Sequence, residues 1–172
     1  MAYIQYSDPT YLNGRSRAAF RAASITVSIG SWTPVVSIRP KAAVASLIIF
    51  DLVHSVSADA VNEAPWSWGL FLNPTIGGTD AASWVDLNNS DAQYDVSRTN
   101  LNTITAGTLL AAGSLGANNT SNQVSPSSFP YISVAEPIAL GVAPSTKNQI
   151  VLAAYADSTV NFRGALNWRE KL

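Results

Sequence analysis

The sequence predicts an all-β protein, an antiparallel β-sandwich of jelly-roll-like type with an extended N-terminal arm. Two observations predict this fold. First, about nine or ten short segments at hairpin spacing read as β-strands, several of them with alternating apolar and polar residues. Second, no internal segment shows a convincing helical period. At 172 residues the chain is long enough for one domain with its own core. We therefore expect an arm over residues 1–23 and a single sandwich domain over residues 24–172.

The composition indicates an unusually uncharged surface. Only 12% of the residues are charged and the formal net charge is −1, against about 25% charged residues in ordinary soluble domains. Such a surface suits a subunit of an assembly, so we expect an oligomer. The alternative is a stable monomer with a polar but uncharged surface. The absence of cysteine excludes disulfides and thiolate metal sites.

Three other features of the chain bear on its partners and location. Residues 1–21 hold no continuous apolar segment of the kind found in secretory signal peptides, so we expect no export signal. The longest apolar run, residues 42–53, is shorter than the roughly 20 residues of a membrane-spanning helix, and no membrane partner is expected. The arm has three arginines but no lysine, and the chain has no overall basic charge. We therefore expect no nucleic-acid partner.

The arm ends in a basic segment, RSRAAFRAA, in which Arg15, Arg17 and Arg21 surround Phe20. Alanine and arginine favour helix, so this segment could form a short helix with a basic face, although so short a helix is marginal alone. Two interpretations stay open. Either the arm packs on a neighbouring subunit, or it is a terminus that is frayed or packs on its own domain.

The first half of the domain is expected to begin with three strands. The inward side chains of the first are Ile25, Val27 and Ile29. Residues 35–39 form the second, and because Pro34 and Pro40 cannot donate to a ladder we expect an edge position or a bulge. Residues 44–53 are almost continuously apolar, which predicts a strand covered on both faces. A buried carboxylate needs a partner, so we place Asp51 at the exit of that strand.

The central stretch, residues 65–96, has the densest alternation and predicts two hairpins. A strand up to Pro74 should turn four side chains toward the core, those of Trp66, Trp68, Leu70 and Leu72. Gly77 and Gly78 can take the positive φ of a tight reversal, so the chain should turn there and return over residues 83–86.

A second turn is expected over residues 88–91, and the strand after it should carry Tyr94 inward and Asp95 outward. The segment GTLLAAGSLG predicts a further apolar strand. Residues 117–130 lack any period and predict a long exposed loop, which we favour as a contact loop.

The C-terminal part carries the clearest strand signals. Short strands are expected over residues 131–134 and 138–142, and a buried strand over residues 150–155. From Val160 the chain alternates strictly, which specifies its register because a slip of one residue would expose the whole apolar set. The inward side of this last strand is Val160, Phe162, Gly164, Leu166 and Trp168.

No arrangement of residues points to catalysis, and we expect neither an enzyme nor a cofactor. His54 is the only histidine, so a catalytic triad or a zinc site has no signature. Four carboxylates lie in or near the central turns and could pair for glycoside hydrolysis or bind calcium, but aspartate also forms turns on its own account, which we favour. They are Asp80, Asp86, Asp91 and Asp95.

Exposed aromatic side chains could instead stack on sugars. Trp66 and Trp68 share a face with leucines and are assigned to the core. Trp32 and Trp84 lie near turns and remain candidates for glycan contact. Together with the turn and loop residues Asn89 and Asn119, Trp84 is a candidate loop contact.

Four segments carry a resemblance to a known group of proteins. They are LFLNPTIGGT with the Trp-Val-Asp step that follows, AQYDVSRTN, AGTLLAAGSL and STVNFRGALNWRE, within residues 66–115 and 154–170. These segments resemble small β-structured virion proteins of tailed bacteriophages, in particular capsid decoration or cement proteins and related fibre-head modules.

The resemblance implies a structural protein, made in the host cytoplasm, that sits on the outside of a phage capsid and stabilises the shell. Its implied partners are the major capsid protein and other copies of itself, as a homotrimer. The basic segment would then be the contact to the capsid or to a neighbouring subunit, through Arg15, Arg17, Phe20 and Arg21. The alternative is a receptor-binding or fibre-tip module of a phage tail that binds glycans.

Overall fold

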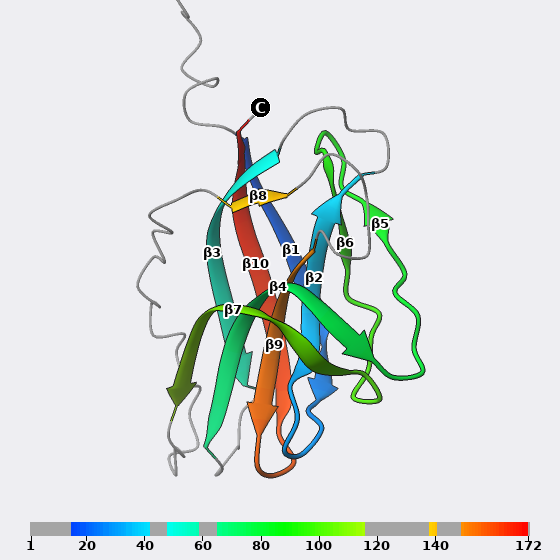
Figure 1. Cartoon of the computed structure of the whole chain (residues 1–172), viewed down its shortest axis with the longest axis vertical. Coiled ribbons are helices and arrows are strands. Elements are labelled where there is room, and N and C mark those ends of the chain that lie inside the picture. The colour runs from blue at the N-terminus through cyan, green and yellow to red at the C-terminus, as the bar shows by residue number, and fades with distance from the viewer. Residues whose placement is uncertain (1–14, 42–47, 59–64, 116–137, 141–148, 172) are drawn as a thin grey trace, which may run out of the picture.

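The described residues of the computed structural model form ten β-strands and no helix (Figure 1). The structure describes residues 15–41, 48–58, 65–115, 138–140 and 149–171. The strands are β1 (Arg15–Thr26), β2 (Thr33–Pro40), β3 (Ile48–Ala58), β4 (Trp66–Gly77), β5 (Val85–Asp86), β6 (Ala92–Asp95), β7 (Thr103–Leu115), β8 (Ile138–Leu140), β9 (Ile150–Ala156) and β10 (Asn161–Lys171).

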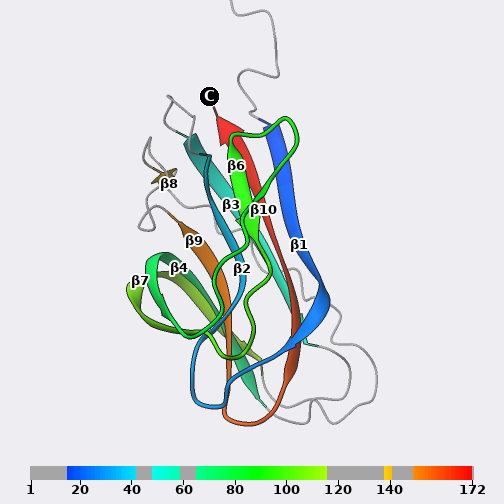
Figure 2. The same ribbon diagram turned by 90° about the vertical axis from the view of Figure 1, so that its right-hand side faces the viewer.

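The strands make two sheets that pack face to face (Figure 2). One sheet has four strands in the order β1-β10-β3-β8, and the other has six in the order β5-β6-β2-β9-β4-β7. Every pairing between these strands is antiparallel. The prediction of an all-β, antiparallel, sandwich-like protein is therefore confirmed.

The order of pairing follows a simple rule along the chain. The first strand pairs with the last, so that β1 pairs with β10, β2 with β9, β3 with β8 and β4 with β7. The β5–β6 hairpin lies between β4 and β7 in the sequence and is added beside β2 at the edge of the larger sheet. The chain thus resembles one long hairpin folded over into two layers.

The core lies between the two sheets, and β10 supplies much of it. Phe162, Leu166 and Trp168 are buried while Asn161 and Arg163 are exposed, which confirms the alternation expected for this strand. Across the core the rings of Phe162 and Trp66 meet edge to face, with centroids 4.8 Å apart. Such contacts join the sheets because both inner faces interdigitate.

The strand β4 places its alternate residues Trp66, Trp68 and Leu70 in the core, as expected. The predicted hairpin between this strand and residues 83–86 is wrong, because β4 lies between β9 and β7 while β5 pairs with β6. Pro74 fails to end the strand, since the register shifts around it.

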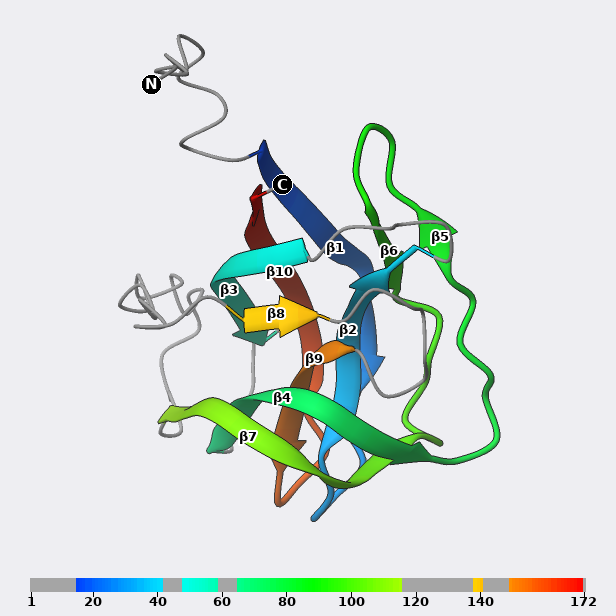
Figure 3. The ribbon, with the colours of Figure 1, turned by 45° about the horizontal axis from the view of Figure 1, so that its top comes forward.

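That irregularity is held by a specific set of hydrogen bonds. Asn73 has a positive φ of 49°, and its backbone N–H donates to the backbone carbonyl oxygen of Gln149 at 2.8 Å. The Gln149 side chain donates in turn to the carbonyl oxygen of Pro74 at 3.2 Å. With three register shifts between them, β4 and β7 curve strongly together (Figure 3).

The proline-flanked strand β2 is buried along its length and lies between β6 and β9, so the predicted edge position is wrong. The other expectation, a bulge, is confirmed by the register shift between Pro34 and Val36. Pro40 is the last residue of the strand, where it interrupts the ladder least.

The basic segment is a strand, and the predicted helix is wrong. Residues 15–21 pair with β10 in unbroken register, and Ala19 and Arg21 are buried while Phe20 is exposed, a two-residue period. The long edge of β10 provides the hydrogen bonds that a short helix would lack. Residues 15–23 thus form a strand on their own domain, in agreement with the second interpretation of this segment, and residues 1–14 lie outside the described part.

Asp51 lies inside β3, opposite Arg169, so its predicted place at the exit of the strand is wrong. Of the expected strand at residues 138–142, the part over Ile138–Leu140 is present as β8, and residues 141–142 lie outside the described residues. The expected loop at residues 117–130 and the expected strand at residues 131–134 lie outside the described residues.

Removing the ring of Phe162 should destabilise the fold, because the side chain is fully buried between the sheets. Phe162→Ala should lower the free energy of unfolding by about 3–5 kcal/mol. Phe20→Ala is the matched control, since the Phe20 side chain is 57% exposed on β1. This substitution should lower the free energy of unfolding by less than about 1 kcal/mol. Chemical denaturation measures both, and equal losses would contradict this assignment of the core.

Candidate functional site

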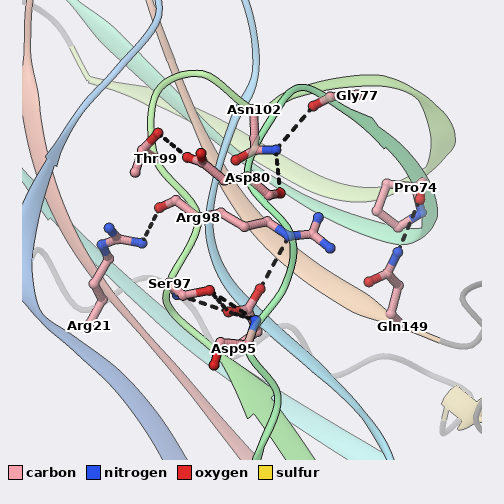
Figure 4. Close-up of polar contacts among 11 residues, drawn as sticks. Arg21, Pro74, Gly77, Asp80, Asp95, Ser97, Arg98, Thr99, Asn102 and Gln149 are labelled. Carbon is pink, nitrogen blue, oxygen red and sulfur yellow. Dashed lines mark hydrogen bonds and ion pairs between the residues drawn. The ribbon is translucent and has the colours of Figure 1, made fainter.

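The two arginines of β1 whose side chains are described connect the two layers. Arg17 donates to the carbonyl oxygen of Asn89, in the turn between β5 and β6. Arg21 donates through Nη1 to the carbonyl oxygen of Arg98 at 2.8 Å (Figure 4). Because Arg21 is only 8% exposed, the structure gives it an internal role. The side chain of Arg15 lies outside the described part.

Asp95 is the centre of this polar cluster and is only 2% exposed. One carboxylate oxygen lies 3.2 Å from Nε of Arg98. The other accepts hydrogen bonds from the backbone N–H and hydroxyl of Ser97, at 2.9 and 2.6 Å, and from the N–H of Ser83 at 3.3 Å (Figure 4). The predicted outward position of Asp95 is therefore wrong, because the segments on either side of the β5–β6 hairpin fold over it.

Asp95 supplies the negative charge of this cluster, and Arg21 and Arg98 carry positive charges around it. Burial lowers the pKa of Arg21 and of Arg98 from the usual arginine value, and attraction to Asp95 acts in the opposite direction. A buried carboxylate is stable only when it is paired and hydrogen-bonded, as this one is. The cluster therefore has a structural explanation, since it anchors the segments around β6 against β1.

Trp84 is half-buried, and one face of its ring is covered. The guanidinium carbon of Arg39 lies 4.1 Å from the ring centroid, within cation–π distance, and Nε of Arg39 donates to Gln93 at 2.9 Å. Only the other face could stack on a sugar. Asn89 is exposed at the β5–β6 turn with a positive φ of 53°, and Asn119 lies outside the described residues.

The loop that precedes β7 is held tightly. The Asn102 side chain donates to the carbonyl oxygens of Gly77, at 3.4 Å, and of Asp80, at 3.0 Å, and Thr99 donates to the Asp80 carboxylate (Figure 4). Gly78 has a φ of +123°, and a Cβ there would come within 2.2 Å of the carbonyl oxygen of Leu101. Only glycine fits this position.

Exposed apolar residues lie on the segments that meet beside this loop. Ser28 donates to the carbonyl oxygen of Asn100, and the N–H of Ile104 donates to the carbonyl oxygen of Trp32, at 2.9 Å. These bonds bring the β1–β2 loop against the start of β7. We call the resulting group the Trp32 surface, and its members are Ile29, Trp32, Leu101, Leu109 and Tyr155.

Trp32 is the centre of this surface. Its ring contacts that of Phe71 at 5.3 Å, nearly edge on, and that of Tyr155 at 5.5 Å with a 48° tilt. A Cβ added to Gly69 would meet Trp32 at 3.0 Å and Leu109 at 3.1 Å, so both side chains lie over that glycine. Glycine at this position lets the aromatic ring lie close to the sheet.

The apolar members of the Trp32 surface are well exposed. Ile29 and Leu101 are each 61% exposed and Leu109 is 48% exposed, three of the five large hydrophobic side chains that are exposed in the described residues. The expected inward position of Ile29 is wrong, because β1 ends at Thr26 and the chain leaves the sheet before it. The sequence points to Trp32 through its place near a turn, but not to this grouping, because two loops and the strands β7 and β9 bring its members together.

A polar group borders the same surface. The hydroxyl of Tyr155 donates to the carboxylate of Asp157 at 2.9 Å, and both groups are exposed to solvent. This hydrogen bond raises the pKa of Tyr155, and the negative charge of Asp157 adds to the effect. The surface therefore combines aromatic and aliphatic side chains with one carboxylate at its border.

The described residues do not bring metal-ligating side chains together. They contain no group of three or more histidine, cysteine or acidic side chains that could hold a metal ion. His54 lies in β3 opposite Leu166, and its side chain is not described. Within the same ranges no helix is long and apolar enough to cross a membrane. Of the central carboxylates, Asp80 and Asp95 hold loops in place.

Comparison with known proteins identifies no relative. No protein-family model matches the chain, and neither a curated protein nor a solved structure matches it. The Trp32 surface is therefore the candidate site on its geometry alone.

Asp95→Asn should destabilise the fold, because it leaves the surrounding arginines without their buried counter-charge. We expect a loss of about 3–5 kcal/mol in the free energy of unfolding. Asp86→Asn is the control: its side chain is 64% exposed, 4.0 Å from Lys41, and a surface pair contributes about 1 kcal/mol or less. Thermal unfolding of both variants compares them, and a stable Asp95→Asn protein would show that the cluster is not an anchor.

Proposed function

We propose that the chain is a structural virion protein of jelly-roll type that binds the outside of a phage capsid and stabilises the shell. The strand order supports the jelly roll. Pairing of the first strand with the last, through four successive pairs in two sheets, is the arrangement expected of a long antiparallel hairpin rolled into a sandwich. Jelly rolls occur in viral capsid domains and in lectins.

The observation that carries the binding role is the Trp32 surface. Exposed apolar side chains that gather in one place indicate an interaction surface. Here they lie on a sandwich whose neighbouring loops are held by hydrogen bonds. The low charge of the chain also suits a subunit of a large assembly. The capsid as partner comes from the resemblance to phage decoration proteins.

The mechanism is a thermodynamic one. A protein that binds the assembled shell and not its alternatives adds its binding free energy to the assembled state. Contacts with more than one capsid subunit would strengthen the attachment through multivalency. Phe20, 57% exposed on β1, remains a second candidate contact. Arg21 is a poor candidate because it is buried.

Binding to capsids that lack the protein tests the proposal. Ile29→Ser combined with Leu101→Ser should weaken binding at least about tenfold, because burial of one such side chain is worth roughly 1.5–3 kcal/mol. Val85→Ser is the control. Val85 is 46% exposed, but it lies on β5 and is not part of the Trp32 surface, so this variant should bind as the wild type does. Sedimentation of the protein with capsids measures the binding.

Several outcomes would contradict this proposal. Wild-type protein that fails to sediment with capsids, or equal binding by the double variant, would do so. Closed particles formed by the purified chain alone would assign it to the shell itself.

Glycan binding is the second candidate, and one observation favours it. Trp32 and Tyr155 present tilted aromatic rings beside the carboxylate of Asp157. Aromatic faces can stack on the apolar faces of sugars while a carboxylate accepts hydrogen bonds from hydroxyls.

Glycan-array binding tests this candidate. If it is correct, wild-type protein should bind, Trp32→Ala should abolish binding, and Trp84→Ala, which removes a ring already covered on one face by Arg39, should retain it. Copy number in the particle separates the two functions. Many copies per capsid support decoration, and a few copies at the tail support receptor binding.

A further inference from the structure

The outer edge of β7 is the feature that the proposed function leaves unexplained. β7 is the last strand of the six-stranded sheet and pairs with β4 on one side, and no described strand pairs with its other side. It is 13 residues long, TITAGTLLAAGSL, and has neither a charged residue nor a proline. Long, uncharged edges of this kind invite pairing with another strand.

The other three edge strands have features that prevent such pairing. β5 has two residues and β8 has three, so each offers a very short edge. β1 is long, but it carries three arginines, and the register along it shifts between Arg21 and Ile25. Short edges, charges and bulges are the usual protections of natural sheets. The contrast makes β7 the one long edge without charge among the described strands.

One section of β7 is regular enough to receive a strand. Residues 111–115 pair with residues 66–70 of β4 without a shift, whereas the register changes at three points beyond Leu70. In this section a Cβ on Gly113 would come within 2.6 Å of Trp68, so position 113 faces the core. Ala112 and Ser114 face the other way, and both are exposed.

We propose that β7 pairs antiparallel with β7 of a second copy of this chain, across residues 111–115. A two-fold axis at Gly113 would place it opposite its own counterpart and Ala112 opposite Ser114 of the second copy. The two six-stranded sheets would then form one continuous sheet. The inference does not depend on capsid or glycan binding.

A second copy is the occupant that the section itself favours. The section is uncharged, so it has no group that would select a charged peptide. Its alanine, glycine and serine side chains let a strand approach closely, and the same residues serve both copies. Isologous two-fold contacts of this kind are the commonest in homo-oligomers. The low charge of the whole chain also favours self-association, because copies repel one another little.

Introduced charge should separate the copies. Ala112→Lys combined with Ser114→Lys would place lysines directly opposite lysines at two positions of the paired edge, where like charges repel. Wild-type protein should have the native mass of a dimer, and the double variant that of a monomer with an unchanged β-type circular dichroism spectrum. Ala18→Lys with Ala22→Lys on β1 adds the same charge at exposed alanines and should remain dimeric.

Disulfide crosslinking provides a second measurement. It tests the pairing even if the lysine variant fails to fold. The natural chain has no cysteine, so Ala112→Cys with Ser114→Cys should form an intermolecular disulfide across the axis under mild oxidation. The same change at Ala18 and Ala22 should not. Non-reducing electrophoresis separates the crosslinked dimer from the monomer.

Several results would contradict the pairing of β7 with β7 of a second copy. A monomeric wild-type protein across a dilution series, a trimeric mass such as the resemblance to decoration proteins implies, or a dimer that survives the β7 lysines would each overturn it. So would crosslinking at β1 in place of β7. None of these measurements uses a capsid, so their result is separate from that of the binding test.

Discussion

The pairing of β10 with both β1 and β3 is the constraint on which the smaller sheet depends. β10, near the C-terminus, pairs with β1, the first described strand. The inward residues of β10 form one side of the core. Phe162 meets Trp66 of the other sheet, so one strand fixes both the order of its own sheet and the packing of the two layers. Because β1 is the first described strand and β10 the last, their pairing joins the most widely separated strands of the described residues.

A second link joins the layers at the open side of the sandwich. Arg21 reaches from β1 to the backbone beside β6, where Asp95 is hydrogen-bonded to the segments that flank the β5–β6 hairpin. The resemblance to virion proteins implies that Arg15, Arg17 and Arg21 are outward contacts. For Arg21, burial and the bond to Arg98 favour a structural role, because a buried guanidinium needs acceptors close by.

The surfaces left for binding lie at the curved part of the larger sheet. The register shifts between β4 and β7 bend this pair, and Trp32 and Leu109 lie over Gly69 on its outer face. The same strand β7 carries Leu109 and presents the uncharged edge. An apolar surface and a free edge so close together would allow copies to associate with each other and with a larger partner at once.

The sequence by itself determined the class of the fold and, for the two most regular strands, β4 and β10, the side that faces the core. Strict alternation from Val160 to Trp168 allows only one register, and the stretch from Trp66 to Leu70 does the same. Alternation is a local property, so it can be seen without a structure. It does not say which strand lies beside which.

Only the tertiary structure decided the partners and the site. β4 pairs with β9 and β7 and not with its neighbour in sequence, and the basic segment became a strand because β10 offers it an edge. Asp95 was expected outside and is buried, since segments before and after its hairpin fold over it. The Trp32 surface combines residues far apart in the chain. Contacts of that kind depend on how the sheets close, which no local pattern encodes.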